Sequence, residues 1–145
     1  MEPVKVNFQL KGIELLELNL KNPQTQLNPE RTYDFNISIE QGINNLEKRV
    51  VVITSIDLIF KENLQNHASI KTSCIFAIEN LQDFIVENSN EVKFPQQFVT
   101  TLNSIALSTT RGIMFSHFKG TFLNNVILPI IDPSAFTVIN ADQIG

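Results

Sequence analysis

Few residues in this chain are of the types that perform chemistry, and they are widely spaced. The single cysteine, Cys74, and the two histidines, His67 and His117, could form a nucleophile–base pair if the fold brought a thiol and an imidazole together. Cys74, however, lies in the middle of an apolar, strand-like segment, which is more typical of a small buried hydrophobic residue. A catalytic or ligand-binding role for His117, near the end of a predicted helix, is a separate hypothesis.

Other sequence signals of enzymes and metalloproteins are missing. Asp34, Asp57, Asp83 and Asp132 are scattered and form no paired-carboxylate motif. The sequence has no glycine-rich phosphate loop and no G-x-S-x-G elbow. A zinc site needs more His or Cys at useful spacing than the chain supplies. We therefore expect a protein that is not an enzyme and that uses no metal and no cofactor.

Charge and hydropathy argue against two classes of partner. The 145 residues include 11 Lys and Arg against 15 Asp and Glu, a net charge of −4, with no basic stripe, so we expect no nucleic-acid binding. The first residues, MEPVKVNF, lack a signal-peptide pattern, and the longest apolar run, 126–131, is far shorter than the roughly 20 residues that span a bilayer. With one cysteine and hence no internal disulfide, the sequence predicts a cytoplasmic protein without membrane insertion.

Alternating hydrophobicity predicts four strands in the first part of the chain. Their expected ranges are about 3–20, 32–40, 49–61 and 69–79. In the first strand the adjacent pair Leu15 and Leu16 breaks the alternation, so we expect a bulge near Gly12 or Leu15. The connections are short and contain no helical segment, which favours an antiparallel β-meander. Residues 81–93 give no clear prediction.

A long helix is predicted at about 95–119. Pro95 suits a first helical turn, and apolar residues recur at helical spacing until Gly120 can end the helix. No charged residue lies between Lys93 and Arg111, although a helix on a sheet usually carries charges on its solvent side. Either this side is weakly polar and solvated, or, as we favour, it packs against another subunit. The residues predicted for this oligomer interface are Phe98, Leu102, Ile105, Ser108 and Gly112.

The last segment, 120–145, is apolar but follows no single period. Pro129 and Pro133 rule out a continuous helix. Two interpretations stay open for this C-terminal arm. It packs into the core of its own subunit, or it forms the wall of an apolar groove that is partly open to a partner.

The order of four antiparallel strands, a long helix and a proline-interrupted arm resembles the bacterial export chaperone SecB and its SecB-like relatives. The residues that carry the resemblance are Arg111 in the helix, Gly120-Thr121-Phe122 beginning nine positions later, Leu128-Pro129, Phe136, and the segment CIFAIEN at 74–80. The resemblance implies an α+β, SecB-like fold in one domain that spans 1–145. It also implies a homo-oligomer, a tetramer or a dimer, with an eight-stranded sheet per dimer and the long helices packed between dimers.

The resemblance also implies a function. SecB-type chaperones hold unfolded polypeptides in apolar grooves, so we expect a holdase that serves protein export. Only the segment TVINADQIG follows Phe136, where export SecB continues into a second helix and a tail that contact the motor ATPase SecA. The alternative is therefore a SecB-like module dedicated to one partner, such as an antitoxin, without docking on SecA. The residues expected to line the client-binding groove are Phe122, Val126, Ile127, Leu128, Ile130, Ile131 and Phe136.

Overall fold

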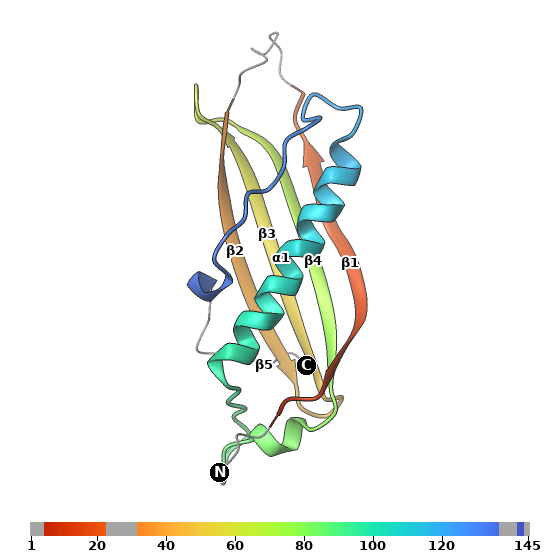
Figure 1. Ribbon diagram of the computed structural model, residues 1–145, viewed down its shortest axis with the longest axis vertical. Helices are drawn as coiled ribbons and strands as arrows, with labels where there is room; N and C mark the ends of the chain where they lie inside the picture. The colour runs from red at the N-terminus through yellow and green to blue at the C-terminus, as the bar shows by residue number, and fades with distance from the viewer. Residues whose placement is uncertain (1–4, 23–31, 137–141, 144–145) are drawn as a thin grey trace.

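A computed structural model describes residues 5–22, 32–136 and 142–143 of the chain (Figure 1). In the described part, one sheet has the strand order β1-β4-β3-β2-β5, and the long helix α1 lies across one of its faces. The predicted fold class is confirmed, because a four-stranded antiparallel sheet is followed by one long helix. The elements in chain order are β1 (Phe8–Leu20), β2 (Tyr33–Asn44), β3 (Arg49–Phe60), β4 (Asn66–Ile78), η1 (Leu81–Phe84), α1 (Gln96–Phe118), η2 (Pro133–Phe136) and β5 (Asp142–Gln143).

The predicted meander is wrong in its first connection. β2, β3 and β4 are successive antiparallel neighbours, but β1 pairs with β4 rather than with β2. The connection of residues 21–32 is long enough for this crossing. The three strand spacings between β1 and β2 amount to about 15 Å, whereas a connection of this length can extend to roughly 40 Å. The short strand β5, which the sequence did not predict, pairs in parallel with β2.

β1 contains the irregularity that its sequence predicts. Its register with β4 shifts between Leu10 and Gly12 and again between Leu15 and Glu17, so the predicted bulge is confirmed and a second one follows it. At Gly12 an added Cβ would come within 3.4 Å of the Ile75 side chain. Such bulges bend the strand. Residues 3 and 4 of the predicted first strand lie outside the described residues, and the strand itself begins at Phe8.

Two other strand boundaries differ from the prediction. β2 continues to Asn44 instead of ending near residue 40, because the next three residues are buried and stay paired with β3. β4 begins at Asn66, three positions early. Residues 81–93 form the 3₁₀ helix η1 and an isolated bridge between Ile85 and Val92. α1 agrees with its predicted range to within one residue at each end.

The core lies between the sheet and the inner side of α1. Ile56 of β3 and Phe76 of β4 are fully buried. Met114 and Phe118 of the helix pack in the same core, with at most 1% of each exposed. Burial of side chains of this size contributes roughly 1.5–3 kcal/mol each. The helix is therefore fixed on the sheet by its own subunit, and it can serve as a rigid support for the arm that follows it.

Cys74 is fully buried in β4, so the expectation of a small buried hydrophobic residue is confirmed. Burial raises the pKa of its thiol above the usual range, and a hydrogen bond with Thr109 lowers the pKa by less. Because the thiolate is the reactive form, we expect an aromatic disulfide reagent at about pH 8 to label the native protein at least roughly tenfold more slowly than the denatured protein. Absorbance of the released thiolate measures both rates, and equal rates would contradict this expectation.

Candidate functional site

A groove lies between β2 and the described part of the arm, residues 120–136. It is a shallow, open groove of about 520 Å³, lined by Tyr33–Ile37 of β2 and by Pro129, Ile131 and Phe136 of the arm. Figure 1 shows the arm running back along the sheet, beside α1 and on the side of β2. Its walls combine apolar side chains with the polar Asp34 and Asn36, and a volume of this order is typical of binding sites.

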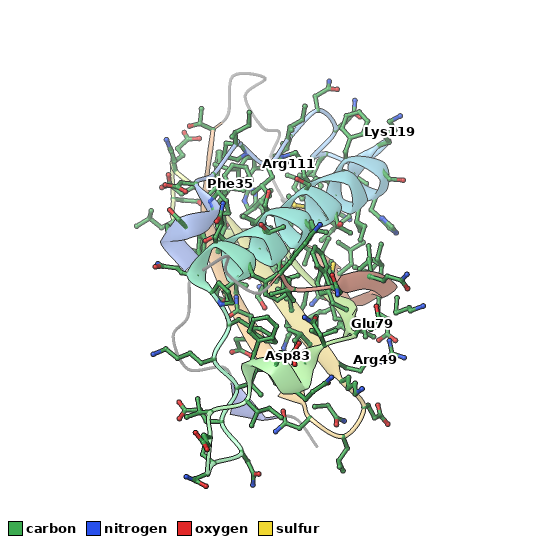
Figure 2. All side chains as sticks on the ribbon, turned by 60° about the horizontal axis from the view of Figure 1, so that its bottom comes forward. Phe35, Arg49, Glu79, Asp83, Arg111 and Lys119 are labelled. Carbon is green, nitrogen blue, oxygen red and sulfur yellow. The ribbon has the colours of Figure 1, made fainter. Side chains whose placement is uncertain are left out.

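Arg111 of α1 fixes the first half of the arm. Its Nε donates a hydrogen bond to the carbonyl of Leu128 at 2.8 Å, and its Nη2 donates to the carbonyl of Pro129 at 3.0 Å. Hydrogen bonds from a charged donor are stronger than neutral ones. Figure 2 shows Arg111 and, on β2, Phe35 on the side of α1 where the arm lies. Arg111 therefore holds the arm at the upper end of the groove wall.

Asn103 of α1 fixes the second half of the arm. The side chain is fully buried, and its Nδ2 donates to the carbonyl of Phe136 at 3.0 Å and, more weakly, to that of Pro133 at 3.5 Å. Its Oδ1 accepts a hydrogen bond from Nε2 of Gln41 in β2, which is also buried. A buried amide without partners is costly, so this connected set fixes helix, arm and strand together. We call Gln41, Asn103 and the Phe136 carbonyl the amide latch.

Between these two attachments, Asp132 and Ser134 form a turn that is held by hydrogen bonds among its own residues. Asp132 Oδ1 accepts hydrogen bonds from the Ser134 amide at 3.0 Å and from Ser134 Oγ at 2.7 Å, and these bonds hold the pKa of the carboxyl below its usual range. The carboxylate caps η2, which carries Phe136. The arm is thus shaped by its own residues and attached by those of α1.

The residues predicted for client binding divide between the two interpretations of the arm. Leu128 is buried, so it belongs to the core of its own subunit. Ile127 is 54% exposed and Ile130 is 95% exposed, so both can contact a partner. The remaining four residues, Phe122, Val126, Ile131 and Phe136, are partly buried against the core. Of these, Ile131 and Phe136 also line the groove.

The residues predicted for an oligomer interface lie on different sides of α1. Phe98 and Leu102 are buried in the core of this chain, because the apolar positions at helical spacing are those that face the sheet. Ile105 is half-buried, and Ser108 and Gly112 are exposed on the outer side. These last three stay available to a second copy, and the interface itself stays a prediction.

His67 and Tyr33 form a part of the site that the sequence did not reveal. The Tyr33 hydroxyl and His67 Nδ1 are 2.9 Å apart, and Tyr33 lines the groove. The His67 ring stacks on Phe60 at 4.8 Å and meets Phe122 of the arm edge-on at 5.9 Å. His67 is 4% exposed, although the predicted fourth strand began only at about residue 69. It supports the groove wall and the start of the arm.

The chemistry considered for the cysteine and the histidines has no geometric support. His67 and Cys74 lie seven positions apart on β4, which corresponds to about 23 Å along a strand. His117 is exposed, and its Nδ1 lies 3.0 Å from the Ile113 carbonyl of its own helix. Within residues 5–22, 32–136 and 142–143, no group of three or more His, Cys, Asp or Glu could hold a metal ion. Over the same residues, no helix is long and apolar enough to cross a membrane.

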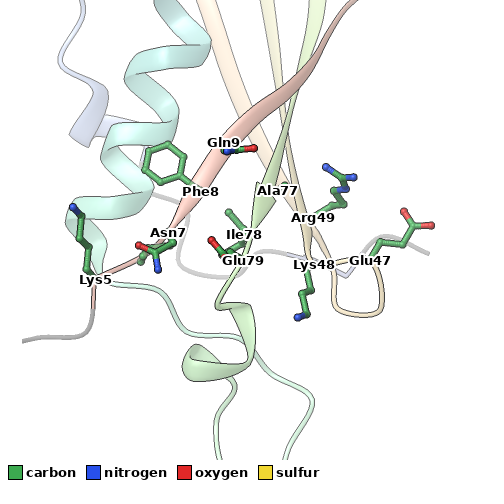
Figure 3. A pocket seen from close by; sticks show the side chains of 11 residues that line it. Lys5, Asn7, Phe8, Gln9, Glu47, Lys48, Arg49, Ala77, Ile78 and Glu79 are labelled. Carbon is green, nitrogen blue, oxygen red and sulfur yellow. The ribbon is translucent and has the colours of Figure 1, made fainter.

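Two further surfaces lie away from the groove. The edge strand β1 exposes four large apolar side chains, Leu10, Ile13, Leu15 and Leu16. A second hollow of about 780 Å³ lies where β1 begins, beside the turn between β2 and β3. Its lining mixes both signs of charge, and Figure 3 shows that Lys5, Lys48 and Arg49 point in different directions. This hollow therefore presents no converging set of donors.

Comparison with known proteins identifies the fold. No protein family matches the sequence, and no curated protein is detectably similar to it in sequence. Among solved structures, the chain is similar to the SecB-like chaperone Rv1957 of Mycobacterium tuberculosis, solved in complex with a ChAD peptide from the Rv1956 HigA1 antitoxin. The TM-score is 0.60 at 16% identity, over 86% of this chain and 87% of that chain. A protein of unknown function from Streptococcus agalactiae gives a TM-score of 0.44 at 10% identity, over 88% of this chain and 100% of that one. The chain has a SecB-like fold.

Proposed function

We propose that this chain is a SecB-like chaperone that holds non-native polypeptide segments in the groove between β2 and the arm. The observation that carries the proposal is the arm itself. Arg111 and Asn103 fix its backbone, yet Ile127 and Ile130 keep their side chains exposed in the same stretch as Pro129, which lines the groove. Isoleucines held exposed by a fixed backbone suit contact with a partner better than solvation. The similarity in fold to Rv1957 supports the same function.

The binding that we propose is driven by burial of apolar surface. An extended segment would place alternate apolar side chains against the groove walls, and each Å² of apolar area removed from water contributes roughly 25 cal/mol. The interaction recognises a pattern rather than one sequence. A holdase of this kind needs no nucleotide and no metal.

The test compares exposed apolar side chains of the arm with an exposed apolar side chain elsewhere on the chain. Replacing Ile127 and Ile130 with Ser should weaken client binding by about 2 kcal/mol, or roughly thirtyfold, because both side chains lose their apolar contact. Light scattering of a denatured model protein diluted into buffer measures this: wild type should suppress aggregation, and the double variant should require roughly thirtyfold more protein for the same suppression. Leu46→Ser is the control, since Leu46 is also 95% exposed but lies in the turn between β2 and β3. Equal suppression by all three proteins would refute the proposed site.

A second candidate function is a module dedicated to one folded or partly folded partner, such as an antitoxin. Rv1957 was solved with an antitoxin peptide, which favours this alternative. Affinity capture with the full chain distinguishes the two functions. One stoichiometric partner indicates a dedicated module, and a broad mixture of non-native chains indicates a general holdase. A role in export, docking on SecA and a cytoplasmic location stay predictions.

We further propose that the protein is a homo-oligomer, a tetramer or a dimer, in which copies join along β1 and along the outer side of α1. The four exposed apolar side chains of β1 support this proposal, as do the small, uncharged residues of the helix, Ser108 and Gly112. Exposed apolar side chains on an edge strand are otherwise a liability. Several grooves on one oligomer would raise the affinity for a long client.

A further inference from the structure

The edge of β2 that faces away from β3 carries the short strand β5. On one side β2 pairs with β3 along its whole length, from Tyr33 to Asn44. On its other side, within the described residues, strand partners exist for Gly42 and Ile43, which pair in parallel with Asp142 and Gln143 of β5. The groove runs beside Tyr33–Ile37 of the same strand. The groove and β5 are therefore neighbours on one strand edge.

The amide latch lies at the boundary between the groove and β5. Gln41 directly precedes Gly42, and it bonds to Asn103, which in turn holds the carbonyl of Phe136. Phe136 lies six positions before Asp142, so the latch ties the chain close to the edge that β5 occupies. A segment tethered at such a distance acts at an effective concentration on the order of millimolar. A pairing of two residues is weak by itself and can be displaced.

We propose that β5 is a built-in competitor for the β2 edge. The proposal rests on the proposed function, because the competitor matters only if the groove binds extended segments. A short segment beside Tyr33–Ile37 leaves β5 in place. A longer segment that continues along β2 past Gln41 must first displace Asp142 and Gln143 from Gly42 and Ile43. Because of this competition, a long segment binds along β2 only if its affinity is high enough to displace β5.

The test removes the backbone pairing of β5 and controls for the loss of its side chains. The variant Asp142→Pro/Gln143→Pro lacks the two amide donors, and the matched control Asp142→Ala/Gln143→Ala loses the same side chains but keeps both amides. Two fluorescein-labelled peptides with alternating Val and Thr serve as probes. One has about twelve residues, the length of β2, and the other has about five, the length of the groove-lining segment.

Fluorescence anisotropy should give a roughly threefold to tenfold higher affinity of the proline variant for the long peptide than of wild type or the alanine control. All three proteins should bind the short peptide equally. If the long peptide binds all three proteins equally, the competitor does not exist and the proposed function stands. If neither peptide binds any of them, the proposed function fails as well.

Amide hydrogen exchange tests β5 without any ligand. In wild type and in the alanine control, at least one of the Asp142 and Gln143 amides, the one that points toward β2, should exchange at least roughly threefold more slowly than in an unstructured peptide of the same sequence. Exchange as fast as in that peptide would overturn the proposal, whatever the peptide affinities.

Discussion

Asn103→Leu should destabilise the protein by about 2–4 kcal/mol and abolish most client binding. The substitution leaves the buried Gln41 amide and the partly buried Phe136 carbonyl without their partner, and an unsatisfied buried group costs roughly 1–3 kcal/mol. A loss of this size is a large part of the stability of a typical domain. Denaturant unfolding at one fixed protein concentration measures the change, because an oligomer gains stability with concentration.

A second variant separates stability from the position of the arm. Replacing both Gln41 and Asn103 with Leu removes the unpaired amide as well, so part of the stability should return. The arm still lacks its second attachment, and suppression of aggregation should stay weak. Full recovery of suppression in the double variant would show that the latch does not position the arm. An Asn103→Leu protein as stable as wild type would contradict the buried network itself.

Ile13→Glu should break the proposed contact between copies along β1 and reduce the size of the oligomer. Ile13 lies opposite Cys74 and hence on the helix side of β1, where it is exposed in the isolated subunit. If copies join along β1, the new carboxylate becomes buried without a partner, which costs about 3 kcal/mol or more and weakens self-association at least a hundredfold. Light scattering coupled to size-exclusion chromatography should then give a smaller multiple of the 16.4 kDa of one chain than wild type gives.

Gln9→Glu is the matched control for this experiment. Gln9 lies opposite Ala77, on the other face of the same strand, and it is exposed. The variant adds the same charge, so its mass should equal that of wild type. Circular dichroism checks that both variants are folded. A wild type that elutes as a monomer would refute the oligomer, and an Ile13→Glu protein of unchanged mass would place the interface elsewhere.

The local structure of this protein could be predicted from its sequence because local patterns determine it. Alternating hydrophobicity located the strands, the adjacent leucines of β1 revealed its bulge, and Pro95 and Gly120 bounded α1. The partner of β1 could not be predicted, because a connection of twelve residues, 21–32, reaches either edge of the sheet. β5 is too short to leave a pattern.

The site was harder to predict, because its key contacts are between side chains and distant backbone. Asn103 reads in the sequence as one of several small neutral residues of the helix, yet it is fully buried and holds the arm. Ile127 and Leu128 are adjacent and equally apolar, but one is exposed and the other is buried. Leu128, the buried one, is also the residue whose carbonyl accepts a hydrogen bond from Arg111.

The two bulges of β1 affect how the protein can misassemble. The exposed leucines of this strand would suit endless stacking of chains into fibres, in which flat strands repeat without limit. Each bulge adds local twist and interrupts the ladder of hydrogen bonds, so successive copies cannot align over a long, flat edge. A closed, finite assembly tolerates such an edge, whereas an amyloid-like filament does not.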